Sequence, residues 1–352
     1  MTHLELFSGI GGFRQAMRLL SNDGGPRFDC IGFSEIDTAA TKTYLANFDT
    51  TNERVLGDIS AFVENGDSVA HLPRFDLLTG GFPCQSFSMM GEQRGFEDAR
   101  GTLFFCMAQL IKACKPDYLL LENVKNLRTH DSGKTYQVIE HTLSGMGYRV
   151  FSDIFNTSEF GLAQVRNRIY IFATTTKLPR NFLFSADAIK RNFEAIRKTS
   201  LVKQRRTSDA LHKNAPSKYW LSDRIKRTIL ANGSGGFIAK SEIDLDIARP
   251  LCATMAKMHR ACQDNYFSEA FIDTNGKQRY AGGVDGCENV RIRRLMPEEA
   301  FELQGFDSAF VKNARRQFGI ADSSFYKQAG NAISVNVVYA ILAYLSSTLN
   351  WR

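Results

Sequence analysis

The chain has 352 residues, a formal net charge of +7 at pH 7, 23% charged residues and 43% hydrophobic residues. This composition is ordinary for a soluble globular protein, and the length allows a catalytic domain with a smaller one. No apolar run looks long enough to span a bilayer and no basic leader precedes the first strand pattern, so we expect a cytoplasmic protein without a membrane partner. The seven cysteines lack Cys-x-x-Cys or Cys/His zinc spacing, which predicts reduced thiols and no metal site.

The first predicted unit is a strand, a glycine turn and a helix. Residues 3–7 have a strand pattern, residues 8–12 (Ser-Gly-Ile-Gly-Gly) form the turn, and residues 13–20 have helical spacing. Gly9 and Gly11 would let a ligand approach the backbone, and the free N–H groups of the helix suit an anionic group. Because the usual third glycine of a dinucleotide fingerprint is absent, an ordinary turn is an equal alternative.

Acidic side chains follow the next two predicted strands. Glu35 follows the strand at 30–34, and Asp58 follows a short third strand. An acid at the second strand tip commonly holds a ribose diol, and an acid at the third suits an adenine amino group. Glu35 could instead be a helix N-terminal charge, since Asp37 opens the predicted helix at 38–47.

Cys84 follows a predicted buried strand at residues 75–79, at the end where open α/β sheets keep their ligands. Pro83 fixes the backbone before the thiol, and Gly80 and Gly81 would allow a turn there. This arrangement suits a nucleophile, although a buried structural thiol fits the local sequence equally well.

Glu122 follows another buried strand at 116–121, between predicted helices at 102–113 and 133–145. Strands at 148–155 and 164–172 come next, and alternation brings Arg166 and Arg168 to one face of the second. Two such arginines could bind an anion or a carbonyl, or could be ordinary surface residues. The repeated strand and helix pattern to about residue 175 predicts an α/β fold with a doubly wound, mostly parallel sheet.

Beyond this point the pattern becomes irregular and basic. Residues 175–230 contain fourteen lysines and arginines against four acidic residues, which suggests a polyanion partner or a solvated basic face. The last helix, at about 333–345, is apolar enough to pack back on the sheet. We therefore expect a catalytic domain at 1–185 plus 320–352 and a smaller irregular domain at 186–319.

Taken in chain order, these motifs resemble the DNA cytosine-5 methyltransferase family, in particular its compact bacterial members. The resemblance implies a Rossmann-like S-adenosylmethionine-dependent fold in which the irregular domain recognises the DNA target. The matching segments are 7–12, 81–85, 122–124, 164–168, 293–306 and 330–331. Asp307 stands where the family often has proline, Ala329 where an aromatic residue is frequent, and Pro250 where a threonine is frequent.

The resemblance implies methyl transfer from S-adenosylmethionine to carbon 5 of a flipped-out cytosine in a specific double-stranded DNA sequence. Such an enzyme belongs to a restriction-modification system or is an orphan, acts without metal, and is expected to be a monomer. The implied catalytic residues are Cys84 as nucleophile, Glu122 as acid, Arg168 at the ring carbonyl and Arg166 as its support. The implied cofactor-binding residues are Phe7, Gly9, Gly11, Glu35, Asp58, Pro83 and Asn331. The implied DNA-binding residues are Ser86, Ser88 and Arg94 in a closing loop at 86–101, and Thr254.

Three alternatives stay open at this point. A tRNA-methylating member of the family usually carries a Cys-Phe-Thr tripeptide, which this sequence lacks. A DNA-binding homologue without catalysis is disfavoured by the presence of Cys84, Glu122 and Arg168. A nicotinamide or flavin oxidoreductase would explain the glycine turn but not the pair Pro83-Cys84.

Overall fold

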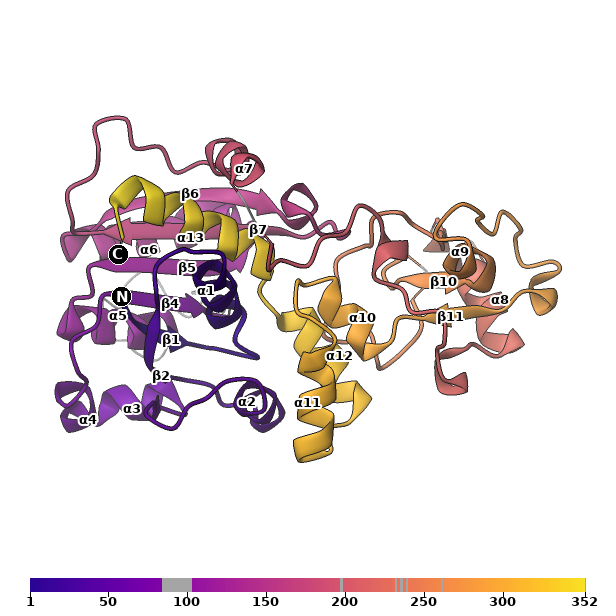
Figure 1. The fold of residues 1–352 in the computed structure, drawn as a ribbon, viewed down its shortest axis with the longest axis horizontal. Coiled ribbons are helices and arrows are strands. Elements are labelled where there is room, and N and C mark those ends of the chain that lie inside the picture. Colours follow the sequence, from indigo (N-terminus) through magenta and orange to yellow (C-terminus); the bar gives the residue numbers. More distant parts are fainter. Residues whose placement is uncertain are drawn as a thin grey trace.

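The computed structural model describes residues 1–83, 103–196, 199–231, 233–234, 237–238, 240–260 and 262–351. Within these residues, a seven-stranded sheet with helices on both faces forms the larger lobe (Figure 1). Its strand order is β3-β2-β1-β4-β5-β7-β6. The strands are β1 (Thr2–Leu6), β2 (Asp29–Phe33), β3 (Arg54–Val55), β4 (Leu77–Gly81), β5 (Tyr118–Val124), β6 (Arg149–Asn156) and β7 (Asn167–Thr174).

The direction of the strands confirms the predicted mostly parallel, doubly wound α/β sheet. Strands β1 to β5 pair in parallel, whereas β7 is antiparallel to both of its neighbours, β5 and β6. The chain winds from β1 to one edge of the sheet and then returns to place β4 on the other side of β1. The carboxyl ends of β1 and β4 therefore form the switch point, where such sheets bind ligands.

The helices cover the two faces of the sheet because successive strand residues point to opposite sides. In β5, Leu120 belongs to the buried core cluster of the first face, and Leu119 and Leu121 belong to that of the second. The first face carries α1 (Gly12–Asn22), α2 (Thr38–Leu45), α7 (Ala186–Ala195) and α13 (Val335–Leu349). The second carries α3 (Ile59–Glu64), α4 (Gly66–Ala70), α5 (Leu103–Cys114) and α6 (Lys134–Gly145).

A smaller lobe lies beside the sheet, with α10, α11 and α12 between the two (Figure 1). Its described strands have only two or three residues, in keeping with the irregular pattern of the sequence. The smaller lobe contains α8 (Asp223–Leu230), β8 (Gly233–Ser234), β9 (Phe237–Ile238), β10 (Tyr266–Ser268), α9 (Glu269–Asp273) and β11 (Ile292–Arg294). The helices between the two lobes are α10 (Pro297–Glu302), α11 (Ala309–Phe318) and α12 (Asp322–Asn331). Short 3₁₀ helices are η3 (Lys125–Arg128), η4 (His130–Gly133), η5 (Thr157–Phe160), η6 (Thr207–Asp209), η7 (Ser217–Tyr219) and η8 (Cys287–Asn289).

Helix α7 lies within the range expected for the smaller domain but contacts α13 and β6 of the larger lobe. Its buried residues Ile189 and Phe193 belong to the core cluster of the first sheet face. We therefore propose that the smaller domain begins after α7 rather than at residue 186.

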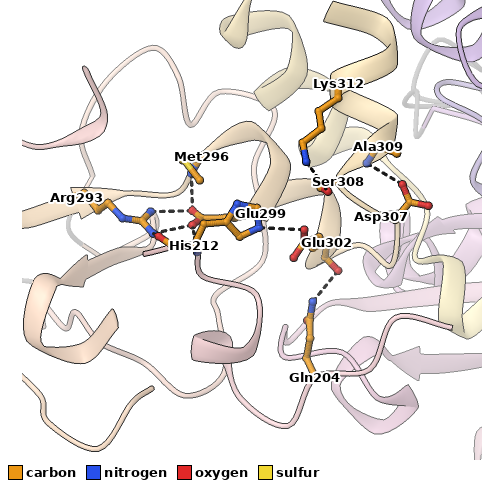
Figure 2. A network of polar contacts seen from close by, with 10 residues as sticks. All are labelled: Gln204, His212, Arg293, Met296, Glu299, Glu302, Asp307, Ser308, Ala309 and Lys312. Atoms are coloured by element: carbon orange, nitrogen blue, oxygen red, sulfur yellow. Dashed lines mark hydrogen bonds and ion pairs between the residues drawn. The ribbon is translucent and has the colours of Figure 1, made fainter. Parts of the chain in front are cut away.

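A fully buried ion pair links the smaller lobe to α10 (Figure 2). The guanidinium of Arg293, at β11, donates to both carboxylate oxygens of Glu299 at 2.6 and 2.8 Å. The same carboxylate accepts from the backbone N–H groups of His212 and Met296. These neighbours compensate the desolvation of both charges, which would otherwise be costly.

The stretch Asp322–Leu349 has the length and apolar composition to cross a membrane. From the sequence alone, no apolar run was predicted to be long enough to do so. Of the most apolar window in this stretch, 72% is buried inside the protein, where α13 packs against α1. A core helix of a globular lobe has the same properties.

Candidate active site

A cavity of about 550 Å³ opens at the switch point between β1 and β4. Parallel strands end on the same edge of a sheet, so the residues that follow β1, β2, β4 and β5 meet there. The cavity wall also includes the end of α12 and the segment that follows it. Of the predicted site residues, those lining the cavity are Phe7, Gly9, Glu35, Asp58, Pro83, Glu122, Arg166, Arg168 and Asn331.

Other predicted residues are not among those that line this cavity. Gly11 and Thr254 are absent from its wall, and Thr254 is exposed on the smaller lobe. The whole proposed closing loop at 86–101, with Ser86, Ser88 and Arg94, lies outside the residues that the structure describes, and so does Cys84.

The loop after β1 uses backbone conformations that favour glycine. Gly9 has φ of 56° and Gly11 has φ of 83°, both in the left-handed region, and Phe7 adopts a φ of 52°. A Cβ atom at Gly11 would lie 2.4 Å from Cε2 of Phe48. Gly11 is therefore required by its conformation and by packing against Phe48, whereas Gly9 and Gly12 line the cavity.

Glu35 holds the glycine loop as well as facing the cavity. Its Oε2 accepts from the N–H of Gly9 at 2.8 Å, and its Oε1 accepts from the N–H groups of Ile36 and Asp37. A carboxylate offers about four acceptor positions, so these bonds leave roughly one for a ligand. The sequence predicted the position of Glu35 but not its hydrogen bond to the glycine loop.

Asp37 and Asp58 both cap helices. Asp37 accepts from the N–H groups of Ala39 and Ala40 at the start of α2, and Asp58 accepts from that of Ser60 at the start of α3. Lys327 of α12 places its Nζ 2.5 Å from the Asp37 carboxylate at the edge of the cavity. Asp58 makes this cap through Oδ1, so Oδ2 of its exposed carboxylate is available to accept from a ligand.

The chemical centre of the cavity is the pair Glu122 and Arg168. Oε1 of Glu122 lies 3.0 Å from Nε of Arg168, and the two side chains are only 10% and 20% exposed. Burial raises the pKa of the Glu122 carboxyl, while the charges of Arg168 and Arg166 oppose that rise. The arrangement offers a poised acid beside a hydrogen-bonding cation.

The backbone that leads to Cys84 is held by a neighbour of Glu122. Nδ2 of the buried Asn123 donates to the carbonyl of Phe82 at 2.8 Å. The expected glycine turn is wrong, because Gly80 and Gly81 are the last residues of strand β4. A Cβ atom at Gly81 would meet Cδ1 of Ile333 at 2.9 Å, so this glycine provides space beside Glu122.

Arg166 lines the cavity from just before β7, but within the described part of the chain its side chain donates hydrogen bonds to backbone carbonyls. NH1 donates to the carbonyl of Leu251, and NH2 donates to those of Gly330 and Ala332. Arg166 is 2% exposed. It therefore differs from Arg168, whose guanidinium contacts the carboxyl of Glu122.

Sequence reasoning missed Ser8, Ser34 and Gln328, which also line the cavity. The hydroxyl of Ser8 is buried and has no hydrogen-bond partner among the described residues. Ser34 donates to the carbonyl of Gly57, and Gln328 accepts from Thr43. Ser8 within the glycine loop and Ser34 at the strand end were the available signals. Across the described ranges, no group of three or more His, Cys, Asp or Glu could hold a metal ion.

Comparison with known proteins decides the family. A family profile described as C-5 cytosine-specific DNA methylase matches residues 1–347, nearly the whole chain. The chain belongs to the C-5 cytosine-specific DNA methylase family. Its enzyme class is DNA cytosine-5 methyltransferase, and membership implies a DNA substrate and a methyl-donor cofactor.

Relatives of this methylase include bacterial type II methyltransferases. The type II methyltransferase M.HaeII of Haemophilus aegyptius is 35% identical over 354 residues, covering 99% of this chain and 93% of the relative. M.SsoII of Shigella sonnei is 34% identical over 351 residues, covering 99% and 80%. The crystal structure of the S. pombe Dnmt2 methyltransferase has a TM-score of 0.69, covers 100% of both chains and is 19% identical, which shows the shared fold alone.

Proposed function

We propose that this methylase transfers the methyl group of S-adenosylmethionine to carbon 5 of a flipped-out cytosine in a specific double-stranded DNA sequence. The reaction runs through a transient bond between Cys84 and the ring. The main support for this proposal is the buried contact of Glu122 with Arg168, in a cavity whose wall also includes the backbone that leads to Cys84. The enzyme would serve a restriction-modification system or act as an orphan.

The cavity residues fit the methyl donor. A volume of about 550 Å³ falls within the range of roughly 300 to 1,000 Å³ typical of small-molecule sites. Glu35 would bind the ribose, Asp58 the adenine amino group and Phe7 the adenine face. Gly9, Pro83 and Asn331 would border the rest of the molecule. The unpartnered hydroxyl of Ser8 in the same wall is a group that a polar ligand would satisfy.

Chemistry at the base requires activation, because carbon 5 of cytosine is a weak nucleophile. The Cys84 thiolate adds to carbon 6, and electron density moves toward the ring nitrogen, where Glu122 donates a hydrogen bond or its proton. Arg168 binds the ring carbonyl. S-Adenosylmethionine, when bound, supplies an electrophilic methyl group to carbon 5. Loss of the carbon 5 proton to a base and departure of the Cys84 thiolate restore the aromatic ring.

The DNA would be held mainly by the smaller lobe. The target base must leave the helix to reach a cavity at the sheet edge, which requires a closing loop. We assign that task to residues 86–101, with Ser86, Ser88 and Arg94 as DNA contacts, and we place Thr254 against the DNA backbone. The enzyme would act on DNA as a monomer.

Mechanism-based trapping tests the proposal. A duplex that the enzyme methylates is made with 5-fluorocytosine at the target, so that the final proton loss is blocked. The wild type should form a covalent complex, only in the presence of S-adenosylmethionine, that peptide mapping locates at Cys84. Cys84→Ser should bind the same duplex and form no complex. A complex at another residue, or full activity of Cys84→Ser, would refute the assignment.

A further inference from the structure

The hydrogen bonds of Arg166 join two segments that are far apart in the sequence. The guanidinium donates to the carbonyl of Leu251 at 3.3 Å on one side and to those of Gly330 and Ala332 at 3.0 and 2.9 Å on the other. Each acceptor is a backbone atom. The fork of a guanidinium can serve spread carbonyls in fixed directions, which an ammonium group cannot.

The first segment belongs to the side of the protein proposed to hold DNA. Ala248 pairs with residues 163–165 through backbone hydrogen bonds, and the N–H of Leu251 donates to the side chain of Gln164 at 3.0 Å. Gln164 is fully buried and also donates to the carbonyl of Leu303. The chain then leads within three residues from Leu251 to the exposed Thr254.

The second segment belongs to the side proposed to hold the methyl donor. Gly330 and Ala332 flank Asn331, and all of them line the cavity together with Ile333. One cation thus bonds to the backbone on both sides of a predicted donor-binding residue.

The two segments also touch directly. A Cβ atom at Gly330 would lie 2.1 Å from the backbone N of Ala253 and 2.3 Å from the carbonyl carbon of Cys252. Backbone packed this closely leaves no free space, so a displacement of one segment must be transmitted to the other.

The buried side chain of Arg166 is positively charged at neutral pH. Burial and the neighbouring Arg168 lower the pKa of Arg166 to about 10, which still leaves the group protonated at neutral pH. The carbonyl oxygens and the more distant Glu122 compensate the buried charge.

We propose that Arg166 is a positioning residue that couples occupation of the methyl-donor side of the cavity to the grip of the smaller lobe on DNA. This role replaces the catalytic support expected from the sequence, and it rests on the function proposed above. Binding at Asn331 orders residues 330–332, Arg166 transmits that order to Leu251, and the segment carrying Thr254 is set for the DNA.

The test measures DNA affinity of the full-length protein by fluorescence anisotropy, on a duplex that the wild type methylates, with and without saturating S-adenosylhomocysteine. We expect this unreactive probe to tighten wild-type DNA binding by at least about fivefold. Arg166→Lys should keep its affinity for the probe and for DNA alone within about threefold, yet lose the tightening. Arg168→Lys, the matched control, should lose turnover and keep the tightening.

Several results would overturn the proposal. Arg166→Lys that keeps the tightening and loses only turnover would make Arg166 a catalytic residue. If the wild type methylates DNA but binds it with the same affinity with and without the probe, the coupling is refuted and the proposed function stands. If Arg166→Lys does not fold, hydrogen exchange of the wild type decides: the probe should slow exchange at residues 251–255, and unchanged exchange there would refute the coupling. A wild type that methylates no cytosine would remove both proposals.

Discussion

Glu122 and Arg168 are diagonal neighbours across the antiparallel β5–β7 ladder. Glu122 pairs with Tyr170 and Val124 pairs with Arg168, so the acid and the cation point to the same face of the sheet. The contact between them at 3.0 Å depends on β7 running opposite to β5. A regular parallel β7 would place a different residue beside Glu122, so the one reversed strand creates the site.

Replacing Glu122 by glutamine should mainly reduce kcat. Glutamine keeps the shape of the side chain but cannot transfer a proton, so we expect a loss of about 10²- to 10⁴-fold. Affinity for DNA and for S-adenosylhomocysteine should change little, which calorimetry can measure. The control is Glu140→Gln on the exposed face of α6, which should retain wild-type kcat. Near-normal turnover of Glu122→Gln would contradict the role of Glu122 as acid.

Gly330→Ala should weaken the contact between the two segments joined by Arg166. The added Cβ would lie 2.1 Å from backbone, and such overpacking typically costs about 1 to 3 kcal/mol. Denaturant unfolding measures this loss. In contrast, Gly145 at the end of α6 has open space around its Cβ position, so Gly145→Ala should be neutral or stabilising by up to about 1 kcal/mol. Equal stability of the two variants would show that the tight packing at Gly330 is not real.

The buried carboxyl of Glu5 should make the free energy of unfolding decrease as the pH rises. Burial raises the pKa of this carboxyl from 4.5 to about 8, against the opposing charge of Arg14. Between these two pH values the folded protein holds a proton that the unfolded chain has lost, so the free energy of unfolding decreases with increasing pH across that window. Glu5→Gln removes the titration.

Thermal unfolding of wild type and Glu5→Gln at pH 5 and pH 9 checks this expectation. All other titrating groups are the same in both proteins, so the difference in Tm between the two reports on Glu5. Relative to the wild type, the variant should gain stability on going from the lower to the higher pH. A difference in Tm that is the same at both pH values would mean that Glu5 is ionised in the folded protein throughout.

Glu299→Gln should strongly destabilise the joint shown in Figure 2. The substitution leaves Arg293 buried at 0% exposure without its counter-charge, and breaking such a pair typically costs about 3 to 5 kcal/mol. Glu269 pairs with Arg291 on the surface of the same lobe. Glu269→Gln should therefore cost at most about 1 kcal/mol. Similar losses in denaturant unfolding for the two variants would argue against a structural role for the buried pair.

Much of the larger lobe follows from local sequence. Buried parallel strands require continuous apolar runs, and the polar residue at the end of each run marks the sheet edge where ligands bind. Glu35, Asp58 and Glu122 were found in this way, and the structure places all of them around one cavity. For the smaller lobe, the sequence predicted only an irregular structure, because its strands are too short to show a two-residue alternation of side chains.

The sequence by itself determined the alternation of strands and helices, the glycine loop and the identity of the polar groups at the strand ends, because each depends on residues that are neighbours in the chain. Only the tertiary structure decided the reversal of β7, the burial of Glu5 and the partners of Arg166. Arg166 bonds to carbonyls 85 and 164 positions away. Backbone carbonyls are the same in every residue, so no pattern of side chains announces which of them a buried cation will meet.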